Sequence, residues 1–82
     1  MMTPIESIYE IRGAVLDLQK YLHSKDAVVS RRAQIRYEQW VDRFFRENDS
    51  FLAPQQRYSC LHNLDYFMSL IDSAKEYYET DL

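Results

Sequence analysis

Glycine and proline are scarce in this chain, which has one Gly and two Pro among its 82 residues. A β-rich fold needs many turns, and turns draw on both residue types. Their scarcity therefore argues against such a fold and favours a few long helices with short connections. The sequence also lacks an apolar run approaching the roughly 20 residues that cross a bilayer, and it has no signal-peptide pattern. We expect a soluble protein that does not interact with membranes.

Cysteine and histidine are equally rare. Cys60 is the only cysteine, so no internal disulfide can form, and we expect a reducing, cytoplasmic location. His62 and Asp65 have helical spacing but are too few ligands for a structural zinc site. The chain has neither a Gly-rich phosphate loop nor a Ser-His-Asp arrangement. These absences predict no metal, no cofactor and no enzymatic activity.

Aromatic residues, in contrast, are abundant. Seven Tyr, four Phe and one Trp supply the large apolar area that a small core needs. Apolar residues make up 46% of the chain and the formal net charge is −3, which argues against disorder. The length suffices for one domain, and we assign residues 1–82 to a single helical domain.

Apolar side chains recur at helical spacing in three segments, about 4–23, 26–47 and 54–79. Short connections between three helices predict an all-α, up-down-up bundle, and pairing of a helical hairpin with a second copy is the alternative. We expect Leu18 and Trp40 to share an interior with Phe67. The three predicted core stripes are Ile8, Ile11, Val15, Leu18 and Leu22; Val29, Ala33, Tyr37, Trp40, Val41 and Phe44; and Cys60, Leu64, Phe67, Ile71, Ala74 and Tyr78.

Local signals support these segments. Thr3 and Glu6 have the spacing of a capping box at the start of the first helix. Either Ser24 or Asp26 can cap the second helix, and Ser30 is a later alternative. No Gly or Pro follows residue 54, so we expect the third helix to be unbroken. Gly13 falls on the polar side of the first helix, either as a tolerated surface residue or where a partner's backbone comes close.

Two charged stripes are candidates for recognition. On the second helix, Arg32, Arg36, Arg43 and Arg46 fall on one face, and the planar guanidinium fork suits carboxylate or phosphate. The third helix carries an acidic stripe. The two stripes either pair with each other across neighbouring helices or leave the arginines to bind a ligand. The acidic stripe consists of Asp65, Asp72, Glu76 and Glu79.

Some apolar side chains fall outside the predicted core stripes. Tyr66, Leu70 and Tyr77 line up on the third helix, whereas Val28 and Ile35 lie among the arginines of the second. A contiguous apolar strip on a surface indicates a binding site, and Tyr and Arg are frequent at binding hot spots. The alternative is that wide helix faces bury these side chains within the bundle.

These features predict a small protein that binds another protein, of the inhibitor, immunity, chaperone or adaptor type, or that pairs with itself as a homodimer. Tyr66, Leu70, Tyr77 and Ile35 are the expected apolar anchors, and the arginine stripe gives electrostatic selection. Nucleic-acid binding through the same arginines is the second hypothesis. The acidic balance of the whole chain argues against it.

Overall fold

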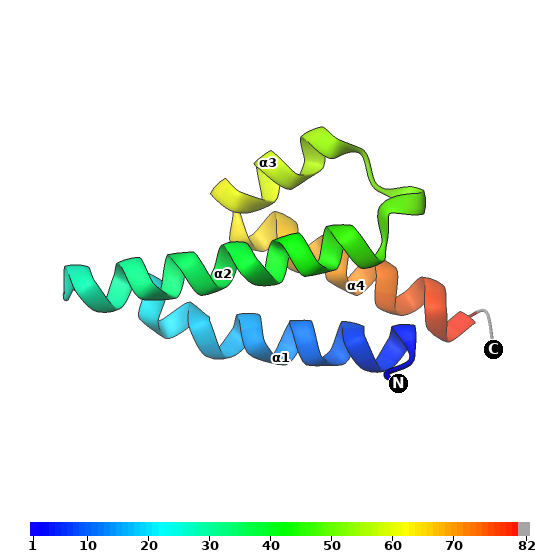
Figure 1. Ribbon diagram of the computed structural model, residues 1–82, viewed down its shortest axis with the longest axis horizontal. Helices are drawn as coiled ribbons and strands as arrows, with labels where there is room; N and C mark the ends of the chain where they lie inside the picture. The colour runs from blue at the N-terminus through cyan, green and yellow to red at the C-terminus, as the bar shows by residue number, and fades with distance from the viewer. Residues whose placement is uncertain (81–82) are drawn as a thin grey trace.

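A computed structural model describes residues 1–80, which form four α-helices and one short 3₁₀ helix (Figure 1). The elements are α1 (Pro4–Leu22), α2 (Ala27–Glu47), η1 (Asp49–Phe51), α3 (Pro54–His62) and α4 (Leu64–Thr80). The predicted all-α class is confirmed. Within residues 1–80, none of the helices combines the length and the apolar character that crossing a bilayer requires.

The first two helices begin at their predicted caps. Thr3 Oγ1 accepts a hydrogen bond from the backbone N–H of Glu6 at 3.2 Å, and the Glu6 carboxylate accepts one from the Thr3 N–H, also at 3.2 Å. This is the expected capping box. Asp26, not Ser24, caps α2, because its Oδ1 accepts from the N–H groups of Val28 and Val29. Both helices therefore start where local chemistry satisfies their first amides.

The predicted third helix is two helices, α3 and α4, separated at Asn63. This residue has an extended backbone, with φ −149° and ψ 100°. Its side-chain Oδ1 accepts a hydrogen bond from the N–H of Tyr66 at 3.0 Å, while its carbonyl accepts one from Phe67. The expectation of an unbroken helix was wrong because it considered only Gly and Pro as breakers. An asparagine that caps the next helix ends a helix as well.

The break also changes the direction of the C-terminal helix (Figure 1). α3 runs back along α2, and α4 then reverses, so that α4 runs opposite to α1 rather than parallel to it. Accordingly Tyr9, near the start of α1, donates a hydrogen bond to Glu79, near the end of α4. The predicted up-down-up order is therefore wrong. An unbroken helix over 54–79 would run roughly 39 Å, longer than the roughly 32 Å of α2. Folding back lets α3 cover α2 while α4 covers α1.

The core lies where α1, α2 and α4 meet, with α3 closing one side. The ring of Phe67 is fully buried and meets Tyr37 and Phe44 edge-on, with centroids 5.7 and 5.3 Å apart. Leu18 and Trp40, expected in the same interior, are only partly buried because they lie on the side of the α1–α2 pair that α4 does not cover. The fully buried side chains are Ile8, Ile11, Val15, Val41, Phe44, Cys60, Phe67 and Ile71.

The N-terminal end of α2 projects past α3 and α4 (Figure 1). Here its neighbour is the end of α1, and the hydroxyl of Ser30 donates a hydrogen bond to the carbonyl of Leu22 at 2.9 Å. Ala33 is still buried, but Val29 from the same predicted core stripe is 36% exposed. The α1–α2 hairpin therefore ends in a two-helix tip whose apolar side chains are open to solvent.

Candidate partner-binding surface

Potential metal-ligating side chains are scattered over the described part of the chain. Within residues 1–80, no three His, Cys, Asp or Glu side chains lie close enough to hold a metal ion. Cys60 is fully buried, and burial raises the pKa of its thiol to about 11. A thiol with a raised pKa stays protonated and is a poor nucleophile. His62 is exposed, and its ring lies against that of Tyr58.

The predicted apolar anchors on the third helix are only partly available. Tyr66 is half-buried, and its hydroxyl accepts a hydrogen bond from the Gln56 side chain at 3.2 Å. Leu70 packs against the core, whereas Tyr77 is 56% exposed and lies against Tyr78. The fold-back of α3 onto α4 explains the change, because α3 covers side chains that an unbroken helix would expose. Leu70 and Tyr77 line one hollow of about 390 Å³ together with Gln56.

Arg43, a member of the predicted arginine stripe, is held within the fold. Its guanidinium pairs with Glu10 of α1 at 2.8 Å and with Glu47 of α2 at 3.3 Å. It also donates a hydrogen bond to Ser7 Oγ at 3.0 Å, and Ser7, which sequence reasoning missed, is buried. The hydrogen bond from Arg43 to Glu10 raises the pKa of the guanidinium further above its ordinary value. Arg43 therefore joins α1 to α2.

The other arginines of the stripe remain open. Arg32, Arg36 and Arg46 are exposed and form no ion pair with any residue of 1–80. Nor does any ion pair within that range join the arginine stripe to the acidic stripe. Asp72 instead pairs with Arg12 of α1 at 3.1 Å. The hypothesis that the two stripes neutralise each other is wrong, because α4 lies along α1.

Arg57 on α3 is an ion-pair residue that sequence reasoning missed. Its guanidinium contacts Asp42 and Glu38 of α2, which are four residues apart and so lie on one helix face. Only that acidic spacing was visible in the sequence. The position of α3 over α2 was needed to supply the cation, and this cluster fastens α3 to α2.

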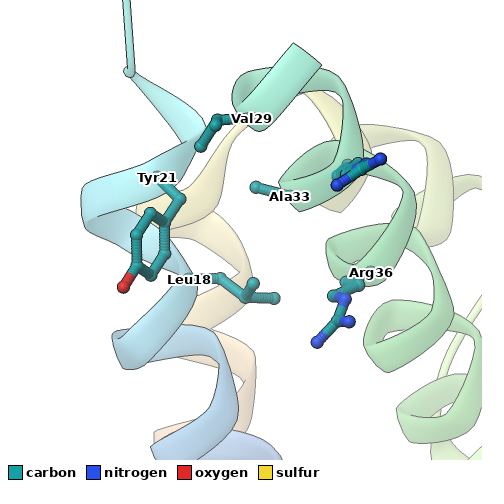
Figure 2. A pocket seen from close by; sticks show the side chains of 6 residues that line it. Leu18, Tyr21, Val29, Ala33 and Arg36 are labelled. Carbon is teal, nitrogen blue, oxygen red and sulfur yellow. The ribbon is translucent and has the colours of Figure 1, made fainter. Parts of the chain in front are cut away.

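A shallow hollow of about 210 Å³ lies on the seam between the last turns of α1 and the first half of α2 (Figure 2). In Figure 2, Leu18 of α1 points toward α2, and the ring of Tyr21 lies over α1 itself. The yellow and orange ribbon of α3 and α4 lies behind the two helices. The hollow thus opens on the side of the α1–α2 pair that α4 leaves uncovered. Its lining consists of Leu18, Tyr21, Val29, Arg32, Ala33 and Arg36.

The apolar surface continues from this hollow around α2. Val28 is 59% exposed and Ile35 is 48% exposed, and both border a second shallow depression together with Arg31 and Arg32. These side chains were predicted to lie among the arginines, and the structure places them beside the hollow as well. We call the whole area the hairpin surface; it comprises Leu18, Tyr21, Val28, Val29, Arg31, Arg32, Ala33, Ile35 and Arg36.

Charge is distributed unevenly around the hairpin surface. Between Asp17 and Arg36 the chain has five basic and two acidic residues, although its overall charge is negative. The remaining residues include five basic and eleven acidic side chains. The tip of the α1–α2 hairpin is therefore positive on an otherwise acidic protein. Such an asymmetry steers acidic partners toward the tip and repels them elsewhere.

Searches of protein-family models, curated protein sequences and solved structures found no match to this chain. The function must therefore be inferred from the chemistry of the surface itself. Two observations are available for that inference: exposed apolar side chains gather on the hairpin surface, and Arg32 and Arg36 stand beside them without an ion pair in residues 1–80.

Proposed function

We propose that this protein is a non-enzymatic binding protein of the adaptor or inhibitor type, and that the hairpin surface is where it binds another protein. The observation that carries the proposal is that open apolar side chains line the same hollow as two arginines that have no ion pair within residues 1–80. Protein interfaces combine an apolar centre that excludes water with polar groups that select the partner by charge. Tyr21 and Arg36 belong to the residue types that dominate binding hot spots.

The hollow beside Tyr77 and Leu70 is the second contact area in this proposal. It lies on α4 near the start of α3, away from the hairpin tip. Tyr66 contributes less than the sequence suggested, because its hydroxyl is already hydrogen-bonded to Gln56. The free, buried Cys60 is compatible with a reducing compartment, and we place the protein in the cytoplasm.

Nucleic-acid binding is the second candidate. A hollow of about 440 Å³ runs along α2 and combines arginines with a half-buried Trp40, as stacking sites for single strands do. Two facts weaken this candidate: Arg43 is already neutralised by Glu10 and Glu47, and the chain is acidic overall. The hollow is lined by Arg36, Gln39, Trp40, Arg43 and Arg46.

Symmetric self-pairing through the hairpin surface is disfavoured. A two-fold interface brings the same surface of both copies together. Arg31, Arg32 and Arg36 of one copy would then face the arginines of the other, and like charges brought together at an interface are repelled. A homodimer therefore remains a proposal for other faces of the molecule, such as the hollow beside Tyr77.

The test is quantitative affinity purification from the native cells, comparing the wild type with a double variant, Arg32→Glu/Arg36→Glu. The matched control is Arg46→Glu/Lys75→Glu, which changes the net charge equally but lies outside the hairpin surface. We expect the wild type and the control to capture proteins that Arg32→Glu/Arg36→Glu does not capture. Identical capture by all three would contradict the proposal. Loss of the captured material after nuclease treatment would support the nucleic-acid candidate instead.

A further inference from the structure

The hairpin surface has the shape that a helix fits. The seam between α1 and α2 forms a groove parallel to the two helices, and α2 spans roughly 11 Å between Val29 and Arg36, about two helical turns. Side-chain ridges of a helix pack into grooves of this kind, and many peptide ligands bind as amphipathic helices in apolar grooves. A segment of about four turns would cover the seam and extend about one turn beyond it at each end.

α4 shows how such a helix packs against this pair of helices. It lies on the opposite side of the α1–α2 pair, with Phe67 and Ile71 in the core. Its acidic residue Asp72 forms an ion pair with Arg12 at the edge of that contact. The α1–α2 pair therefore already holds one acidic amphipathic helix through an apolar stripe flanked by a carboxylate–arginine pair. The seam on the other side offers the same chemistry without an occupant in residues 1–80.

We infer that the hairpin surface binds an acidic amphipathic helix of another protein, seated along the α1–α2 seam. This inference rests on the proposed function and names the chemistry of the partner. The apolar stripe of the incoming helix fills the hollow between Leu18 and Val29. Asp or Glu side chains flanking that stripe pair with Arg32 and Arg36, whose fork geometry suits carboxylates. Charge complementarity selects this occupant over a second copy, whose own hairpin surface is basic.

The exposed apolar side chains favour a helix over a nucleic acid. Phosphate contacts require cations but not aliphatic groups, and Val28, Val29 and Ile35 would gain nothing from a phosphate backbone. An amphipathic helix on the seam buries Leu18 and Val29 and offers carboxylates to Arg32 and Arg36 at once. The inference therefore uses both the apolar and the basic side chains of the seam, whereas the nucleic-acid alternative uses only the basic ones.

The experiment is a selection from a phage-displayed library of helices of about 18 residues, long enough to cover the seam. The library fixes an apolar stripe and randomises the flanking positions among Glu, Gln and Lys. We expect wild-type protein to enrich Glu beside the stripe. The Arg32→Glu/Arg36→Glu variant should enrich Lys at the same positions, and Arg46→Glu/Lys75→Glu should behave as the wild type. Circular dichroism confirms that each variant is folded.

A selected peptide then serves as the probe for affinity. Arg32→Glu/Arg36→Glu should weaken its binding about tenfold or more, and Val29→Ser should weaken it without changing its preference for Glu. Three outcomes would overturn the inference. The wild type enriches no peptide, it enriches peptides without Glu beside the stripe, or Arg32→Glu/Arg36→Glu enriches the same residues as the wild type. Tighter, arginine-dependent binding of a DNA duplex of about 20 base pairs would overturn it in favour of nucleic acid.

The proposed function and this inference can fail separately. One outcome is a native partner that depends on Arg32 and Arg36 but contacts them through a strand or a loop. That result would support the proposed function and contradict the inference of an acidic helix. Cross-linking of that partner, followed by mass spectrometry of the linked peptides, identifies which segment lies on the seam. If no protein from a native cell lysate binds in a way that depends on Arg32 and Arg36, the proposed function is contradicted, whichever peptides the library selects.

Discussion

Asn63 ends α3 and caps α4 through one hydrogen bond, in which its side-chain Oδ1 accepts the backbone N–H of Tyr66 at 3.0 Å. At this contact the chain turns from the direction of α3 into that of α4 (Figure 1). Because α4 turns back at Asn63, its acidic residues meet α1 instead of the arginines of α2.

Asn63→Ala should lower the free energy of unfolding by about 1 kcal/mol, because the first turn of α4 loses the acceptor for the Tyr66 amide. Asn63→Asp keeps an acceptor at the same place and should stay within about 0.5 kcal/mol of the wild type. Urea denaturation followed by circular dichroism measures both values. Equal losses in the two variants would show that the cap does not hold the break.

The sequence predicted which side chains are buried better than it predicted how the helices are connected. The stripe of Cys60, Phe67, Ile71 and Ala74 is buried as expected, because helical spacing continues in phase across the break. Periodicity alone cannot distinguish one long helix from a hairpin of two helices in the same phase. The fold-back is determined by a cap at Asn63 and by tertiary coverage of α2, and neither appears in a spacing pattern.

Arg43→Ala should destabilise the protein by about 1–3 kcal/mol, since it leaves the buried hydroxyl of Ser7 and the carboxylates of Glu10 and Glu47 without their cation. Arg46→Ala removes an exposed arginine from the same helix and should stay within about 0.5 kcal/mol of the wild type. Chemical denaturation of the two variants provides the comparison. Similar values would mean that Arg43 has no structural role.

Tyr37→Phe tests the attachment of α3. The buried Tyr37 hydroxyl donates a hydrogen bond to the Cys60 carbonyl, which joins α2 to α3. Its removal should cost about 1 kcal/mol and should speed amide hydrogen exchange in α3 more than in α1. Tyr58→Phe removes an exposed hydroxyl from α3 and should change neither quantity. Uniform acceleration across all helices in Tyr37→Phe would contradict a local attachment.

The burial of Cys60 predicts a pH dependence of stability. Its pKa rises from the ordinary 9.0 to about 11 in the folded state, because burial disfavours the thiolate. The folded state thus favours the neutral thiol, so this stabilisation is fully present below pH 9 and is lost as pH rises toward 11. A rise of the pKa from 9.0 to about 11 corresponds to a change of about 3 kcal/mol in the free energy of unfolding.

The measurement is the free energy of unfolding between about pH 7 and pH 11, compared between the wild type and Cys60→Ala. The wild type should lose more stability across this range than the variant, which has no thiol to ionise. Native protein at pH 8 should also react slowly with a thiol reagent, and the reaction should become fast when urea unfolds the protein. Parallel pH profiles, or rapid labelling of the folded protein, would show that the thiol is not shielded.

The candidate site was only partly visible in the sequence. Arg32, Arg36 and Ile35 were singled out and do lie together, because one helix carries them at compatible spacing. Leu18 and Val29 were assigned to the core, since a core stripe and an uncovered seam have the same periodicity. Which part of an apolar stripe stays open depends on which side of the helix pair is covered, and α4 lies on the side opposite to the hollow that Leu18 and Val29 line.

Gly13→Ala should raise the free energy of unfolding by about 0.5–1 kcal/mol, because Ala is the better helix former in the interior of α1. A Cβ built at this position meets no atom within 4 Å, and the residue is exposed, so the methyl group causes no clash. Thermal and urea unfolding measure this gain in stability, which would support a tolerated surface glycine. A loss of stability would contradict that interpretation.

The same variant tests the alternative that a partner's backbone comes close to α1 at Gly13. Such a partner would bind Gly13→Ala more weakly than the wild type, despite the gain in stability.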